Sequence, residues 1–323
     1  MNNKNNSQIN KKRVIAEADT GFAGYNGARG DLLHQTILPI IAMSNNNIIP
    51  LGTGFMITNG GIMITARHVI EDFTDRKEIR DLNEPVKNFG LFAIFESDIK
   101  NERTKLSSDC YVGGPLRIIK IYSNAELDIA LCQLKLVRKI DTGEQLQYPL
   151  IRLNLSIPKK GEKILGVGYC KSKVLKYKYK KINKQKIKIL EYSHNFVTTG
   201  GEIVEYINKS QGIRCFPTFL TTARFDPGMS GGPVFRENGS VFGVICSSQS
   251  NCMDKDGYIS YISDIGPALS FKVDILLERD KEPQKFSLLE LINMNVISAD
   301  DSKNEIKIIF DKKGKSFAIR PNK

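Results

Sequence analysis

The sequence lacks the two features that would place the protein in or across a membrane. No apolar run approaches the roughly 20 residues that a membrane-spanning helix needs. The start, MNNKNNSQINKKRVIAEAD, contains no apolar segment of a secretory signal peptide. We therefore expect no membrane span, and we expect the polar residues 1–35, which are rich in asparagine and lysine, to form a disordered tail.

Residue types that bind metals are also scarce. The chain has three histidines and six cysteines, and no two cysteines form a Cys-x-x-Cys pair. Zinc-ribbon spacing is therefore absent, and we expect neither a metal ion nor another cofactor. Several cysteines lie within apolar runs, where a free thiol acts as a small hydrophobic group, which points to a reducing compartment, the cytoplasm. The six are Cys110, Cys132, Cys170, Cys215, Cys246 and Cys252.

Positive charge, by contrast, is abundant. The formal net charge is +12, and the run at 171–192, KSKVLKYKYKKINKQKIKILEY, holds nine lysines against one glutamate. Such a run can attract nucleic acid, an anionic surface or an acidic protein. It can equally form the solvent face of a strand pair, because lysine alternates with valine, tyrosine and isoleucine at period two. We favour the strand pair, and the lack of arginine in the run disfavours phosphate recognition.

Strand signals dominate the chain from about residue 36. Short β-branched and apolar runs follow one another, and Asn-Gly-Gly at 59–61 lies between two of them, which is a strong hairpin signal. Many short strands with little helical periodicity predict an all-β barrel or sandwich. The polar stretch at 136–160 indicates a connector between two β units. The last sixty or so residues differ, with helices expected within 262–280 and at 287–295, and a hairpin at 305–319 turning at 312–314.

Three residues in separate blocks could together carry nucleophilic chemistry. His68 lies in TARHVIED, Asp128 directly precedes an apolar strand in LDIALCQL, and Ser230 lies in DPGMSGGPVF. A serine hydroxyl needs an adjacent base, the imidazole needs a carboxylate to orient it, and the oxyanion that forms needs converging backbone N–H groups. Glu126 is a competing carboxylate; we expect it to face the opposite side of its segment and prefer Asp128.

These three blocks, in this order, resemble the signature blocks of trypsin/chymotrypsin-fold serine peptidases. The most similar branch is that of the bacterial HtrA-like and glutamyl-endopeptidase-like enzymes, in which GTGF precedes the histidine block. The resemblance covers residues 36 to 265. It implies that His68 is the general base and acid, that Asp128 orients it and that Ser230 attacks the substrate. It also implies an oxyanion hole made by the backbone N–H groups of Gly228 and Ser230.

The resemblance implies a fold of two packed antiparallel six-stranded β-barrels, chymotrypsin-like, with a short α/β C-terminal extension. The expected first barrel, with the histidine and the aspartate, is 36–145. The second, with the serine, is 146–265, and the extension is 266–323. The resemblance further implies that Arg224, Cys246, Ser247 and Ser248 contact the substrate.

The chain also departs from the family. Met229 replaces the aspartate that pairs with a newly cut N-terminus in digestive members, so activation by that route is not expected. Ile245 stands where glutamate-specific relatives carry a histidine, although Arg224, if it points into the pocket, would favour an acidic P1 residue. We expect a small or medium uncharged P1 residue. No PDZ-like segment follows the second barrel.

The expected function is a cytoplasmic serine endopeptidase of narrow specificity or conditional activation. Its partners would be protein or peptide substrates and an activating protein. The asparagine- and lysine-rich composition is typical of a low-GC genome and favours a bacterial source. Two alternatives remain open: a pseudoprotease that holds a partner in its cleft, and a binding module that uses the lysine-rich run to hold an acidic protein or nucleic acid. A cysteine nucleophile is excluded because residue 230 is serine.

Overall fold

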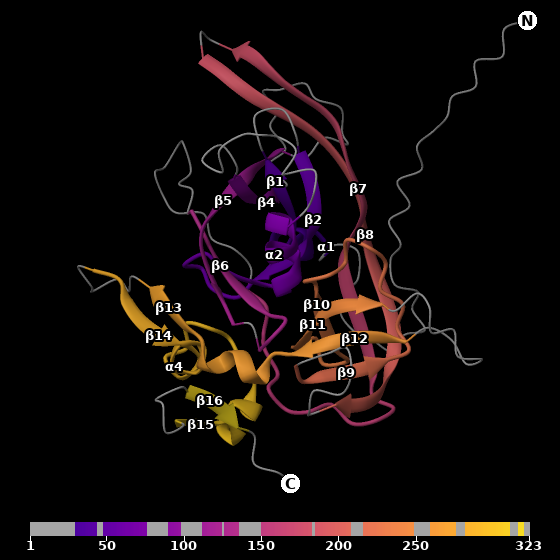
Figure 1. The fold of residues 1–323 in the computed structure, drawn as a ribbon, viewed down its shortest axis with the longest axis vertical. Coiled ribbons are helices and arrows are strands. Elements are labelled where there is room, and N and C mark those ends of the chain that lie inside the picture. The colour runs from indigo at the N-terminus through magenta and orange to yellow at the C-terminus, as the bar shows by residue number, and fades with distance from the viewer. Residues whose placement is uncertain are drawn as a thin grey trace, which may run out of the picture.

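The computed structural model contains two β-barrels followed by a smaller C-terminal extension, as Figure 1 shows. It describes residues 30–43, 48–75, 90–97, 112–124, 126–135, 150–182, 185–207, 216–248, 259–275, 282–310 and 316–319. Most of the predicted N-terminal tail, residues 1–29, lies outside these ranges.

The first barrel is closed, and its strands follow one another in the order β1-β2-β3-β6-β5-β4. All of its pairings are antiparallel. Every residue of the apolar run ILPIIAM in β1 is buried, which explains the lack of polar alternation there. The expected hairpin at Asn-Gly-Gly joins β2 to β3. The strands are β1 (Ile37–Met43), β2 (Ile48–Met56), β3 (Ile62–Thr65), β4 (Gly90–Ser97), β5 (Val112–Ser123) and β6 (Ala130–Leu134).

The second barrel is also closed and antiparallel, with strand order β10-β11-β12-β9-β8-β7. The predicted pair of six-stranded antiparallel barrels is therefore confirmed. The strands are β7 (Lys163–Ile182), β8 (Gln185–Ile207), β9 (Thr218–Thr221), β10 (Pro233–Arg236), β11 (Val241–Ser248) and β12 (Ser260–Asp264).

Strands β7 and β8 are much longer than the other strands of the barrel. They pair from Lys163 opposite Glu202 to Ile182 opposite Gln185. Figure 1 shows this two-stranded ribbon leaving the second barrel and passing the first. The lysine-rich run lies in it, so the predicted strand pair is confirmed. At the base of the ribbon the register shifts between Cys170 and Lys173.

Two short helices flank the first barrel, α1 (Gly30–Thr36) and α2 (Arg67–Asp75). Among the helices that the structure describes, none is long and apolar enough to cross a membrane.

The C-terminal extension consists of two small hairpins and short helices. Its elements are η4 (Gly266–Ser270), β13 (Lys272–Ile275), β14 (Gln284–Ser287), α4 (Leu288–Asn293), η5 (Asp301–Glu305), β15 (Lys307–Phe310) and β16 (Ser316–Ile319). The helix expected at 287–295 and the hairpin expected at 305–319 are confirmed, although the predicted turn at 312–314 lies outside the described residues. Within 262–280, where we expected a helix, the described residues form the end of β12, the five-residue 3-10 helix η4 with Pro267 in its first turn, and strand β13, while 276–280 lie outside the described residues.

The extension packs against both barrels. Lys120 and Tyr122, on β5 of the first barrel, hold Asp274 of β13 through an ion pair and hydrogen bonds. Leu153, in the segment that leads to the second barrel, bridges β11 at Val241 and the extension at Ala299. Buried side chains of the first barrel, the second barrel and the extension share one hydrophobic cluster. The extension is therefore part of the folded body.

Candidate active site

His68 lies in the first turn of the helix that follows β3. Strand β3 ends at Thr65 and α2 begins at Arg67, so His68 is the second residue of the helix. The backbone N–H groups of a first turn have no partner within the helix. The N–H of His68 donates instead to Oδ1 of Asp128, over 3.0 Å. The carboxylate therefore caps the helix whose histidine it also orients.

Asp128 is positioned by a turn between β5 and β6. The N–H of Leu127 donates to the carbonyl of Asn124 over 3.1 Å, and the N–H of Glu126 donates to the Asn124 side chain over 2.9 Å. Asp128 is 4% exposed, whereas Glu126 is exposed. The two carboxylates do separate, but our reason was wrong: residues two apart in an extended strand share a face, and the turn separates them here.

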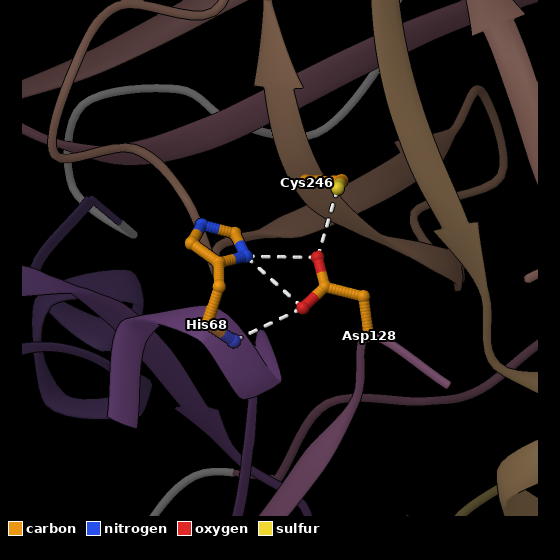
Figure 2. A group of neighbouring side chains, drawn as sticks. All are labelled: His68, Asp128 and Cys246. Carbon is orange, nitrogen blue, oxygen red and sulfur yellow. Dashed lines mark hydrogen bonds and ion pairs between the residues drawn. The ribbon is translucent and has the colours of Figure 1, made fainter. Parts of the chain in front are cut away.

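The imidazole of His68 contacts the Asp128 carboxylate with one ring nitrogen. Nδ1 lies 2.8 Å from Oδ2 and 3.0 Å from Oδ1. A carboxylate only accepts hydrogen bonds, so Nδ1 carries the proton and Nε2 of the neutral ring is the basic nitrogen. Figure 2 shows Nε2 on the side of the ring away from Asp128. This tautomer is the one that a general base requires.

Cys246 contacts the same carboxylate from the second barrel. Its thiol donates to Oδ2 of Asp128 over 2.8 Å (Figure 2). The register of β11 against β12 shifts between Ile245 and Ser247, so Cys246 is the extra residue of a β-bulge. Bulges redirect a side chain and leave a backbone group outside the ladder. Here the redirected thiol reaches Asp128, and the Cys246 carbonyl accepts a hydrogen bond from Ser230 Oγ over 2.9 Å.

The pKa of the Asp128 carboxyl is set by opposing effects. Burial raises this pKa, but the hydrogen bonds and charge of His68 and the hydrogen bond from Cys246 outweigh burial and hold it below its usual value. The carboxylate is therefore ionised at neutral pH, which stabilises a proton on His68 when one arrives.

Ser230 follows a tight turn at 226–229. The N–H of Met229 donates to the carbonyl of Asp226 over 3.0 Å, Pro227 is the second residue, and Gly228 has φ +99°. Proline second and glycine third with positive φ define a type II turn. A side chain at Gly228 would also place its Cβ 2.7 Å from the Tyr169 carbonyl. Only glycine fits this position.

Two backbone N–H groups of this turn are free of protein partners. Within the described part of the chain, the N–H groups of Gly228 and Ser230 donate to no protein acceptor. They are the two donors predicted for an oxyanion hole. The Ser230 hydroxyl, by contrast, donates to the Cys246 carbonyl, and among the described residues no hydrogen bond joins it to His68.

The substrate-contact residues predicted from the resemblance lie in different settings. The Arg224 side chain is 58% exposed, and its Nε lies 3.0 Å from Oδ1 of Asp226. Cys246 is fully buried, and its thiol contacts Asp128. Ser247 and Ser248 complete β11 directly after the bulge. The structure therefore gathers His68, Asp128, Ser230 and Cys246, while Arg224 pairs with its neighbour at the surface.

The other two histidines pack around one tyrosine of β7. Nδ1 of His34 lies 3.3 Å from the Tyr169 hydroxyl, and the ring of His194 meets the tyrosine ring edge-on at 4.6 Å. Both pack in an aromatic cluster with Tyr169 and Phe196 at the base of the ribbon.

Sequence reasoning missed two contacts of the site. It did not place the Cys246 thiol on Asp128, and it gave no role to Thr53 of the GTGF block. The Thr53 hydroxyl donates to the Gly228 carbonyl over 2.8 Å, and the Thr53 N–H donates to the Ser230 carbonyl over 2.8 Å. For the Thr53 contacts, the GTGF block before the histidine was the only signal in the sequence.

Only one group of side chains among the described residues could supply three metal ligands. Nδ1 of His68, a carboxylate oxygen of Asp128 and Sγ of Cys246 lie within 4.8 Å of one another. These atoms are already hydrogen-bonded to one another, so the arrangement serves to orient His68.

Comparison with known protein families identifies this architecture. The profile of the trypsin-like peptidase domain matches residues 52–244, which include all three blocks. The chain belongs to the trypsin-like peptidase family. No curated protein matches the sequence.

Solved structures with a similar fold include the following three, all below 20% identity. The HtrA-type protease AlgW with a decapeptide has TM-score 0.44 and 13% identity, and the match covers 72% of this chain and 63% of that one. The active form of the Rv3671c protease from M. tuberculosis has TM-score 0.42 and 16% identity, with 72% and 78% covered. Deg5 has TM-score 0.43 and 13% identity, with 72% and 85% covered.

Proposed function

We propose that this trypsin-like peptidase is a serine endopeptidase that uses His68, Asp128 and Ser230. The observation that carries the proposal is the pairing of two halves of a catalytic site. One half is the imidazole of His68, oriented by the buried Asp128, and the other is the glycine turn before Ser230, where the N–H groups of Gly228 and Ser230 are left for an oxyanion. Cys246 links the two halves, because its thiol contacts Asp128 and its carbonyl accepts from Ser230 Oγ. The family membership supports the same reaction class.

The proposed reaction begins when Ser230 Oγ attacks the carbonyl carbon of the scissile peptide bond. Its proton passes to Nε2 of His68, and the Asp128 carboxylate stabilises the resulting imidazolium. The oxyanion is bound by the N–H groups of Gly228 and Ser230. When the C–N bond breaks, His68 returns the proton to the leaving amine, which leaves an acyl ester on Ser230. Water activated by the same histidine then hydrolyses this ester.

We propose conditional activity with narrow specificity. The Ser230 hydroxyl donates to the Cys246 carbonyl, so it must give up this hydrogen bond before it can donate to Nε2 of His68. A bound substrate or an activating protein would favour the turned position by its differential affinity for that state. An outward Arg224, paired with Asp226, supports a small or medium uncharged P1 residue.

We also propose that the enzyme works in the cytoplasm of a bacterium. Cys132 and Cys170 are buried and form no disulfide, and burial raises the pKa of the Cys132 thiol to about 12. Thiols of this kind behave as small hydrophobic groups and need no oxidising compartment.

The ribbon of β7 and β8 favours an acidic protein as the partner. The ribbon extends past the first barrel (Figure 1), and the lysine-rich run lies along it. A partner of opposite charge would associate faster and bind less well as salt increases. Nucleic acid is the less favoured occupant because the run has no arginine for bidentate phosphate contacts. A pseudoprotease with such a docking arm is the second candidate function.

The proposal is tested by reaction of the purified full chain with a fluorophosphonate probe, read by intact mass. We expect one adduct per molecule, because only an activated serine displaces fluoride from the probe. A slow digestion of casein beside fast labelling would support narrow specificity. A folded protein that takes up no probe, with or without a candidate partner, would contradict the peptidase proposal and favour the pseudoprotease.

Removal of residues 1–29 is expected to leave the labelling rate within about twofold of the full chain. Digestive relatives use an aspartate before the serine to bind a processed N-terminus, but here the residue is Met229, which is buried in the second barrel. An apolar side chain cannot pair with an amino group. Labelling rates of the two forms, measured in parallel, check this. Dependence on the N-terminal segment would contradict it.

A further inference from the structure

Thr53 of the first barrel forms hydrogen bonds to the turn of the second barrel that precedes Ser230. It lies in the middle of β2 and is fully buried. Its N–H donates to the Ser230 carbonyl, and its hydroxyl donates to the Gly228 carbonyl, each over 2.8 Å. The hydroxyl oxygen accepts from the N–H of Tyr169 over 3.0 Å, and the Thr53 carbonyl accepts from the Thr65 hydroxyl over 2.6 Å. Every polar group of Thr53 is therefore engaged.

The direction of the hydroxyl proton follows from these contacts. A threonine hydroxyl has a single proton to donate and two lone pairs. Because the N–H of Tyr169 occupies a lone pair, the proton is left for the Gly228 carbonyl. The Thr53 hydroxyl therefore accepts a hydrogen bond from β7 and donates one to the serine turn, and the direction of both bonds is fixed.

These contacts determine the orientation of the peptide planes around the serine. The plane between Gly228 and Met229 is held at its carbonyl by Thr53 and at its N–H by the Asp226 carbonyl. The plane between Ser230 and Gly231 is held at its carbonyl by the Thr53 N–H and at its N–H by the Ile245 carbonyl, over 2.7 Å.

The plane that carries the Ser230 N–H lies between these two, and its Met229 carbonyl accepts from the N–H of Gly232 over 2.9 Å. The plane that carries the Gly228 N–H adjoins the first of them. The Gly228 donor is therefore oriented through the plane next to it, which Thr53 holds, whereas the Ser230 donor is oriented by its own plane and by both neighbouring planes. Among the described residues, Thr53 is the only one whose side chain donates a hydrogen bond to the carbonyl of Gly228 or of Ser230.

We propose that the Thr53 hydroxyl is a positioning group for the oxyanion hole, acting through Gly228. This inference rests on the proposed peptidase function. Preorganised donors stabilise the charge that develops in the transition state, and they do little for the substrate carbonyl before attack. The hydroxyl therefore affects the chemical step and not substrate binding.

The decisive variant is Thr53→Val, which keeps the shape of the side chain and removes the hydroxyl. We expect the maximal rate of fluorophosphonate labelling, and kcat on any peptide that the wild type cleaves, to fall about 10- to 100-fold. This is below the roughly 10²- to 10³-fold loss when a donor itself is removed. The half-saturating probe concentration and KM should stay within about twofold. Thr53→Ser, which keeps the hydroxyl, should restore most of the rate.

A matched control separates positioning from stability. Thr58→Val, in the same barrel, also removes a buried hydroxyl that accepts a backbone N–H, that of Ile62, over 3.0 Å. The structure places no contact between Thr58 and the serine turn. Both variants should lower Tm, but only Thr53→Val should lower the rate. Equal rate losses in the two variants, or a rise in KM at constant kcat, would overturn the proposal.

Amide hydrogen exchange at 226–231 gives a readout that does not need catalysis. Loss of the Thr53 hydroxyl should speed exchange of the Met229 N–H at least about tenfold, and Thr58→Val should leave it unchanged. If the wild type neither labels nor cleaves, the peptidase proposal fails, and this exchange still decides whether Thr53 holds the turn. Unchanged exchange in Thr53→Val would overturn the inference.

Discussion

Replacement of Ser230 by alanine is expected to lower kcat for peptide hydrolysis on the order of 10⁶-fold, the loss typical of a removed serine nucleophile. The hydroxyl is the only group of the turn that can form the acyl ester, so no other residue takes over the step. Because the side chain loses one atom and one hydrogen bond, to the Cys246 carbonyl, the fold should be unaffected. The fluorophosphonate adduct should disappear entirely from the intact mass.

Ser156→Ala is a suitable control for this prediction. Ser156 is a half-buried serine outside the site, and among the described residues its hydroxyl bonds to the Asn154 side chain alone, over 2.7 Å. This variant should label as the wild type does. An adduct that persists in Ser230→Ala would show that another residue reacts with the probe, and the assignment of the nucleophile would fail.

The second large effect is expected from Asp128→Asn, with kcat lower by on the order of 10⁴-fold. An amide in this place can donate to Nδ1 of His68, which favours the tautomer with the proton on Nε2, so the base is lost. Glu126→Gln is the matched control, because Glu126 is exposed and two residues away. We expect it to be almost neutral. A large loss from Glu126→Gln beside a harmless Asp128→Asn would reverse the assignment.

Acid stability gives an independent check on Asp128. The pKa of this carboxyl is lowered in the folded chain, so its ionised form stabilises the fold above the unfolded pKa of about 3.9. That contribution is lost as the pH falls below about 3.9 and through the lower folded pKa. Unfolding at acid pH should therefore depend less on pH in Asp128→Asn than in the wild type. Equal pH dependence would contradict the lowered pKa.

The fold could be predicted, and the residues of the candidate site could be named, because their signals are local. Strand runs, the Asn-Gly-Gly hairpin and the three blocks each lie within about ten residues, where side-chain alternation and turn chemistry act directly. Asp128 is the buried carboxylate of the two, but what separates it from Glu126 is a turn held by the Asn124 side chain. The sequence pattern alone could not distinguish this turn from an extended segment.

The remaining parts of the site depend on contacts between distant residues. The Cys246 thiol and Asp128 are 118 residues apart, and the Thr53 hydroxyl and the Gly228 carbonyl are 175 apart. The first contact needs a bulge in β11, which no residue of VFGVICSS marks. The second needs the docking of one barrel on the other. Arg224 differs, because its partner Asp226 is only two residues away; the spacing to Ser230 alone does not show whether the side chain points into a pocket or pairs at the surface.

The division of the site between the two barrels also determines when activity can begin during synthesis. Domains generally fold as units while the chain leaves the ribosome, N-terminal part first. The first barrel brings His68, Asp128 and Thr53, whereas Ser230 and Cys246 arrive with the second. A nascent chain that has completed only its first barrel holds a base without a nucleophile. The proposed activity therefore cannot begin until the second barrel has folded and docked on the first.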